Sequence, residues 1–248
     1  MKFEKMSLEE TAGILEWSII IDDGILPVEK YVLDLYPKLK KINDWKIFSV
    51  DERTNLIKKM IEEDYIRKSI EIGRVLLDYE NIWAKYDVNF TNGMKRVLNI
   101  DFAEKIKNIT VKVGNIPIYP RDISTHCFYI GKMKEEFFIE TVMHEYCHFV
   151  YFEKWKELFK NWKIEEFDSP HLIWNLSEMA IDPILNNEKI QKVYKHKFMA
   201  YENFYKININ GKNLMNTINE IYSKHTVEEA IIKSYEYVLE NQKYVILK

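Results

Sequence analysis

The chain has 248 residues, which is enough for one sizeable hydrophobic core or for two lobes around a cleft. Hydrophobic residues make up 47% and charged residues 30%, and the scarcity of Gly and Pro (7 and 6) argues against an all-β architecture with many turns. The formal net charge is -3 and the Lys and Arg residues are spread along the chain, so we expect no nucleic-acid partner.

Targeting and membrane signals are not expected either. Glu4 lies where a signal peptide would have its apolar core, and no stretch approaches the roughly 20 apolar residues of a membrane span. The two cysteines, Cys127 and Cys147, do not make a disulfide framework and are expected to be buried free thiols. These features predict a cytoplasmic protein without a membrane partner.

The first hundred residues are predicted to form helices, because apolar residues recur at helical spacing and capping residues precede them. The first expected helix starts at a Ser7/Glu10 capping box and ends at Asp22-Asp23-Gly24, and the second runs from Val28 to Ile42 with a bend or break at Pro37. The third starts at Glu52 after an Asp51 cap, and the helical pattern continues from Glu62 to Lys85 with a weak break at Gly73. The last follows an Asn92-Gly93 turn and runs from Met94 to Ile106.

The pattern then changes to short strands. Residues 109–113 alternate between apolar and polar, and residues 116–119 follow a Gly114-Asn115 turn. Residues 124–130 are rich in aromatic and β-branched side chains, and Gly131 ends them. Three strands are therefore expected here.

The remainder of the chain is predicted to be helical. Residues 134–159 carry apolar side chains on nearly every face, so the middle of this helix should be buried. Ser169 and Pro170 are typical of a helix start, and the helix that follows should cover residues 171–181. Two or three further helices are expected, the clearest at residues 227–240.

The most apolar helix contains the motif His144-Glu145-Tyr146-Cys147-His148. Histidines four residues apart share one helix face, so both imidazoles can reach one metal ion. Glu145 is rotated away from them, and its carboxylate can take a proton from a metal-bound water. Zinc lowers the pKa of such a water toward neutrality, and a carboxylate base then completes its deprotonation.

A catalytic zinc site typically has three protein ligands, and Glu178 on the next helix is the best candidate for the third. Asp182 shares a face with Glu178 and could orient a ligand histidine from the second shell, although Pro183 predicts that the helix ends or kinks there. If Glu178 is not the ligand, His171 or Asp182 is next in line. The longer form of the motif, with a glycine and a third histidine, is absent, since Tyr151 and Lys154 stand at those places.

Each of these residues also has an interpretation in which it binds no metal. The two histidines could bond to the helix backbone while Glu145 faces water, and Glu178 and Asp182 could be a surface carboxylate pair. Cys147 is expected to serve in packing, and His171 to be a surface or capping residue.

The HExxH motif with a downstream ExxxD resembles the gluzincin metallopeptidases, the thermolysin-like and related enzymes. The resemblance covers roughly residues 124–182 and implies His144, His148 and Glu178 as ligands, Glu145 as the general base and Asp182 as the second-shell acid. It also implies that the strand at 124–130 is an edge strand that holds an extended peptide. The family uses a later His or Tyr to stabilise the oxyanion, and six residues remain open for that role here: His196, His225, Tyr194, Tyr222, Tyr235 and Tyr237.

We therefore expect an α+β, mainly α-helical protein with a small β-sheet next to a buried HExxH helix and a zincin-like two-lobed cleft. The expected regions are a helical N-terminal region (1–107), the sheet with the HExxH helix (108–160) and a helical C-terminal lobe with the Glu178 helix (161–248). The expected function is that of a zinc metallopeptidase, with one Zn²⁺ per chain and a peptide or protein substrate. The alternative is a non-catalytic protein in which zinc has a structural or regulatory role.

Overall fold

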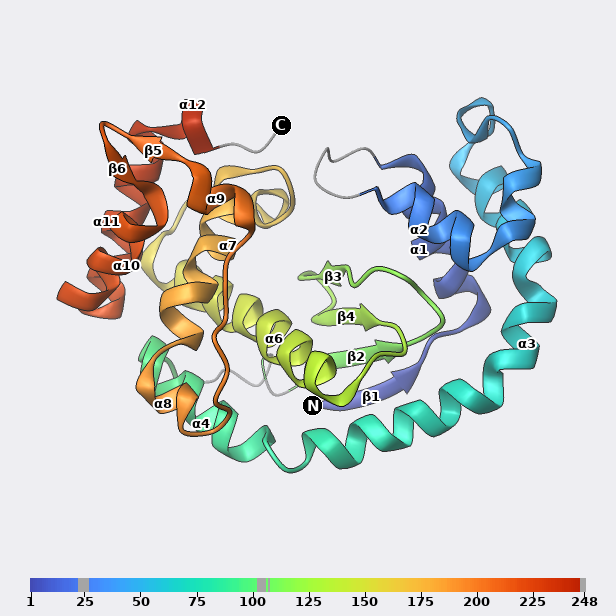
Figure 1. The fold of residues 1–248 in the computed structure, drawn as a ribbon, viewed down its shortest axis with the longest axis horizontal. Helices are drawn as coiled ribbons and strands as arrows, with labels where there is room; N and C mark the ends of the chain where they lie inside the picture. Colours follow the sequence, from blue (N-terminus) through green and yellow to red (C-terminus); the bar gives the residue numbers. More distant parts are fainter. Residues whose placement is uncertain (22–26, 102–105, 107, 246–248) are drawn as a thin grey trace. The chain divides into compact units, whose positions relative to one another are not determined.

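The computed structural model describes residues 1–21, 27–101, 106 and 108–245. It is mainly helical with a small β-sheet, as predicted (Figure 1). Its contacts divide the chain into two compact units, one formed by residues 1–82 and 108–134 and the other by residues 83–107 and 135–248. The sheet thus falls in the first unit and the HExxH helix in the second, whereas the ranges expected from the sequence placed both in one lobe.

The first unit contains the sheet, in which β1 (Lys2–Lys5), β2 (Thr110–Val113) and β4 (Cys127–Ile130) are parallel neighbours. The two-residue β3 (Arg121–Asp122) pairs antiparallel with β4 and forms the outer edge, so the order is β1-β2-β4-β3. β4 therefore lies inside the sheet, so the expectation that residues 124–130 form an edge strand is wrong.

Two further expectations for the sheet need correction, and one of its strands was not predicted. No strand forms at 116–119, and β4 starts only at Cys127, because a turn with positive φ at His126 precedes it. β1 was not predicted, since four residues are too few to show a clear alternation.

The helices of the first unit pack into one hydrophobic cluster that includes Leu15, Val32, Leu39 and Ile57. The Ser7/Glu10 capping box and the break at Pro37 are confirmed, whereas the Asp22-Asp23-Gly24 stop lies outside the described residues. The bounds are α1 (Leu8–Ile20), α2 (Val28–Leu35), η1 (Pro37–Lys41), η2 (Trp45–Ile47) and α3 (Val50–Trp83).

α3 is one long helix where two stretches were expected, and it passes through Gly73 without a break. Its start is capped by Ser49 instead of Asp51: the Ser49 hydroxyl accepts from the Glu52 N–H at 3.4 Å, and the Ser49 N–H donates to a Glu52 carboxylate oxygen at 2.8 Å. Near its other end, Tyr79 donates to the Gly131 carbonyl (3.1 Å) and accepts from the Met133 N–H (2.8 Å), which ties the chain beyond β4 to this helix.

The second unit is helical apart from a two-stranded hairpin, and α6 contacts both α4 and α7. The predicted burial of α6 is confirmed, since most of its residues from Phe138 to Trp155 are buried. α4 starts earlier than expected and contains the Asn92-Gly93 pair, and residues 102–105 of the expected helix lie outside the described residues. The bounds are α4 (Asp87–Leu98), α6 (Glu135–Leu158), η3 (Ile164–Phe167), α7 (Leu172–Leu185), α8 (Glu188–Gln191), α9 (Glu202–Lys206), β5 (Asn208–Ile209), β6 (Lys212–Asn213), α10 (Leu214–Lys224), α11 (Val227–Glu240) and α12 (Gln242–Val245).

α7 differs from its prediction at both ends. His171, not Ser169, is the N-cap residue, and the helix continues through Pro183 to Leu185. A proline removes one backbone hydrogen bond from a helix. The burial of nearly every α7 residue from Ile173 to Leu185 gives packing that offsets this loss.

Across the described residues, no helix is both long enough and apolar enough to cross a membrane.

Candidate metal centre

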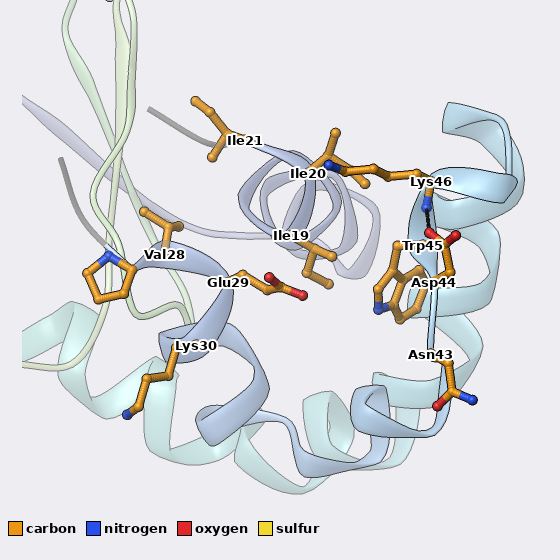
Figure 2. A pocket seen from close by; sticks show the side chains of 11 residues that line it. Ile19, Ile20, Ile21, Val28, Glu29, Lys30, Asn43, Asp44, Trp45 and Lys46 are labelled. Atoms are coloured by element: carbon orange, nitrogen blue, oxygen red, sulfur yellow. Dashed lines mark hydrogen bonds between the residues drawn. The ribbon is translucent and has the colours of Figure 1, made fainter. Parts of the chain in front are cut away.

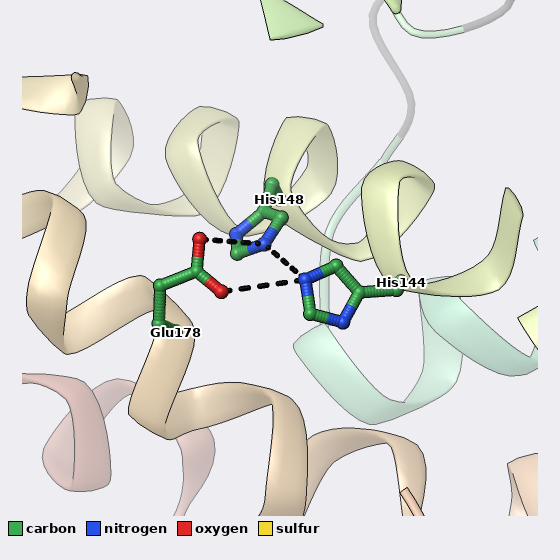
Figure 3. A group of neighbouring side chains, drawn as sticks. All are labelled: His144, His148 and Glu178. Carbon is green, nitrogen blue, oxygen red and sulfur yellow. Dashed lines mark hydrogen bonds and ion pairs between the residues drawn. The ribbon is translucent and has the colours of Figure 1, made fainter. Parts of the chain in front are cut away.

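Two helices bring three metal-ligating side chains together in the second unit. His144 and His148 lie one turn apart on α6, and Glu178 of α7 points at both of them (Figure 3). The two Nε2 atoms are 3.0 Å apart, the Nε2 of His144 lies 3.3 Å from one carboxylate oxygen of Glu178, and the Nε2 of His148 lies 3.3 Å from the other. These are the residues predicted as ligands from the sequence, and the structure brings them into one group.

The distances fit a single metal ion. Nitrogen and oxygen ligands lie about 2.0–2.2 Å from zinc, and in a tetrahedral arrangement two such ligands are roughly 3.3 Å apart. Both N···O separations equal this value, and the N···N separation is slightly shorter. One ion could therefore touch all three side chains without rearrangement of either helix.

The burial of these side chains favours a cation bound between them. His148 and Glu178 have side chains that are 0% and 1% exposed, while 27% of the His144 side chain is exposed. A buried carboxylate is costly unless it is paired with positive charge. A divalent cation would supply that charge, and part of the His144 side chain is exposed to solvent.

The surroundings of α6 hold the histidines in place. The His148 ring stacks on Phe152, and Phe152 stacks on Phe167 of η3. On another face, the Tyr146 hydroxyl lies 3.2 Å from the Thr91 hydroxyl of α4. Burial raises the pKa of Tyr146, so the phenol stays neutral and serves as a hydrogen-bonding anchor. α6 is therefore fixed against α4 next to the two histidines.

Glu145 follows His144 directly on α6, so its side chain leaves the helix about 100° around from that of His144. It is 7% exposed and is not among the three converging ligand groups. The general-base role predicted for Glu145 stays a prediction.

Asp182 has other partners than the ligand histidine that we expected. One carboxylate oxygen accepts hydrogen bonds from the Tyr205 hydroxyl (2.6 Å) and the Asn219 amide (3.2 Å), and the other accepts from the Asn186 amide (2.8 Å). Burial and the adjacent carboxylate raise the pKa of Tyr205, so its hydroxyl remains a donor. Asp182 thus links α7 to α9 and α10. The sequence could not show this, because two of the partners lie 23 and 37 residues away.

Of the six candidates for oxyanion stabilisation, His196 has the most direct connection to the ligand face of α6. Its Nδ1 lies 2.9 Å from a carboxylate oxygen of Glu140, which precedes His144 by one helical turn. Glu140 was not predicted, although its spacing of four residues from His144 places it on the ligand face. The rings of three of the other candidates contact aromatic residues: Tyr194 contacts Tyr86, Tyr235 contacts Trp155, and Tyr222 is close to Tyr151. The remaining two lie near helix ends. His225 is the C-cap residue of α10, and the Tyr237 carbonyl accepts from the Asn241 side chain near the end of α11.

Three other residues considered from the sequence lie outside the converging group or serve in packing. Cys147 is buried and, like Cys127, is a free thiol, as predicted. Lys154 is buried, and its ammonium group donates to the Asn99 carbonyl and pairs with Glu228, each at 2.8 Å, which ties the end of α6 to α4 and α11. His171 is exposed at the start of α7.

The first unit contains a separate pocket of about 380 Å³ between α1, α2 and η2 (Figure 2). Ile19 and Trp45 form apolar parts of its wall, and Glu29, Lys30 and Lys46 add charges of both signs. No group of metal-ligating side chains was found among the described residues of this unit. The centre on α6 and α7 is therefore the better candidate for chemistry.

Comparison with protein-family models, with curated proteins and with solved structures finds no match to this chain. The resemblance to gluzincins therefore stays a prediction based on the motif, and what the centre can do must be argued from its own geometry.

Proposed function

We propose that this chain is a zinc-dependent metallopeptidase, with His144, His148 and Glu178 as the zinc ligands and Glu145 as the general base. The observation that carries the proposal is the convergence of these three ligands at the separations of a tetrahedral zinc site. Imidazole and carboxylate are ligands that zinc accepts readily.

The number of ligands favours catalysis over a structural role for zinc. Structural zinc sites are usually closed by four protein ligands, whereas catalytic sites have three and leave one position open. The group found among the described residues has three members, and one of them, His144, is partly exposed to solvent. The zincin-like two-lobed cleft is part of this proposal, with α6 and α7 on either side of the zinc.

Zinc held by these residues would polarise a peptide carbonyl and lower the pKa of the attacking water. The carboxylate of Glu145 accepts a proton as the water oxygen bonds to the carbonyl carbon. It then passes that proton to the amine as the C–N bond breaks, so that Glu145 is regenerated. His144, His148 and Glu178 keep their places throughout, because burial and the packing around α6 and α7 fix them.

Exchange of Glu145 for glutamine tests this function. Glu145→Gln should retain zinc and fold but lose cleavage by about 10²–10⁴-fold, because an amide cannot accept the proton. The assay is mass-spectrometric detection of products from a broad peptide library, first with the wild type. Glu135→Gln, an exposed glutamate on the same helix, is the matched control and should cleave normally.

Two results would count against the proposal. Equal cleavage by wild type and Glu145→Gln would remove Glu145 from the mechanism. A wild type that binds zinc but cleaves nothing, with all four zinc positions filled by protein, would establish the alternative in which zinc is structural.

A further inference from the structure

An extended segment, Lys195–Ala200, lies between α8 and α9 and belongs to no sheet. Its alternate residues His196, Phe198 and Ala200 turn inward, and Phe198 and Ala200 are 4% and 7% exposed. Residues between them are exposed, with Met199 at 51%. This period of two is that of a β-strand, although no neighbouring strand pairs with it among the described residues.

Side chains take the place of a neighbouring strand along one edge of this segment. The Gln191 amide bonds to both the N–H and the C=O of His196, at 3.2 and 2.6 Å. The Asn186 amide does the same for Phe198, at 3.0 and 2.8 Å, and the Ala200 N–H donates to the Tyr205 hydroxyl at 3.1 Å. The segment is thereby held extended from one side only.

The opposite edge is open. In an extended chain the backbone groups of alternate residues point to opposite sides, so those of Lys195, Lys197 and Met199 face away from Gln191 and Asn186. Within the described part of the chain, these three residues have no backbone hydrogen bond. Unpaired N–H and C=O groups in such a row are a template for another extended chain.

The segment also lies next to the candidate metal centre. His196 contacts Glu140, which is one turn, about 6 Å along the helix axis, from His144. Asn186, the C-cap residue of α7, follows Glu178 by about two helical turns. Figure 1 shows the connection from α8 to α9 running beside α7 and α6.

We propose that the open edge of Lys195–Met199 binds an extended peptide by β-strand addition and so positions the substrate of the proposed peptidase. Main-chain hydrogen bonds to Lys195, Lys197 and Met199 supply the affinity. The exposed ammonium groups of Lys195 and Lys197 lie on the outer face, where they favour acidic side chains at alternate peptide positions. This inference deepens the proposed function and replaces the role expected for residues 124–130.

A binding experiment, in which no peptide is cleaved, tests whether the open edge of Lys195–Met199 binds a peptide. The probe is a short blocked peptide of alternating Glu and Val residues, added to zinc-loaded Glu145→Gln protein and followed by fluorescence anisotropy. Hydrogen exchange should slow at the amides of Lys197 and Met199 when the peptide binds. Lys197→Pro removes one edge N–H and should weaken binding by about tenfold. The control Lys197→Ala keeps that N–H and should weaken binding by less than about fivefold.

A second probe avoids any effect of the proline on folding. The same peptide, N-methylated at alternate residues, cannot pair with the edge and should not bind the unsubstituted segment. Equal binding of the methylated peptide, no binding of the parent peptide, or binding without protection of Lys197 and Met199 would each overturn the proposal. Because no cleavage is measured and the same assay runs on metal-free protein, its failure is distinguishable from a failure of the zinc site.

Discussion

At the scale of single residues, the centre depends on Glu178. It is the only carboxylate in the converging group, and its two oxygens reach different histidines. Its burial at 1% means that α7 holds it inside the protein beside His148, where an unpaired charge would be costly. The pairing of these three side chains is therefore both the strongest structural constraint on the site and the basis for its proposed chemistry.

Loss of this carboxylate should mainly lower the affinity for zinc. Glu178→Ala removes one of three ligands and should weaken zinc binding by more than about 100-fold, since removal of groups that merely support a ligand typically costs about 10–100-fold. Competition with a chromophoric chelator measures the change. Glu136→Ala, on an exposed position of α6, is the control and should bind zinc as the wild type does. An unchanged affinity in Glu178→Ala would move the third ligand elsewhere.

At the scale of elements, patterns within single helices predicted that His144, His148 and Glu178 come together. The HExxH helix was predicted because its apolar residues cover every face, and Glu178 because it lies on the next helix within an apolar stretch. Features set by distant contacts escaped prediction. The inner position of β4 depends on β3 folding back against it, and the partners of Asp182 come from α9 and α10. A sequence read by its local periodicity holds no information on such pairings.

The extended segment offers the clearest test at this scale. Asn186 satisfies the N–H and C=O of buried Phe198 and also bonds to Asp182. Asn186→Ala leaves these groups without partners and should lower the free energy of unfolding by roughly 1–3 kcal/mol. Urea denaturation measures this change, and Asn161→Ala, at an exposed position, is the matched control with an expected change within about 0.5 kcal/mol. If both variants were equally stable, Asn186 would not anchor the segment.

At the scale of the whole molecule, the chain divides into two compact units, and all the residues of the candidate centre belong to the second. There, α6 is fixed by α4 through Tyr146 and Thr91, and α7 is linked to α9 and α10 through Asp182. The ligands are thus carried by helices that are held from several sides. A site preorganised in this way should bind its metal without refolding.

The central claim is that this fold holds zinc between α6 and α7, and the metal content of the protein tests it most directly. Elemental analysis of protein purified without added metal should find about one zinc per chain, as a three-ligand site requires. Metal-stripped protein should take up the same amount on titration, whereas His148→Ala should not. A wild type that contains no transition metal and takes up none tightly would contradict the account.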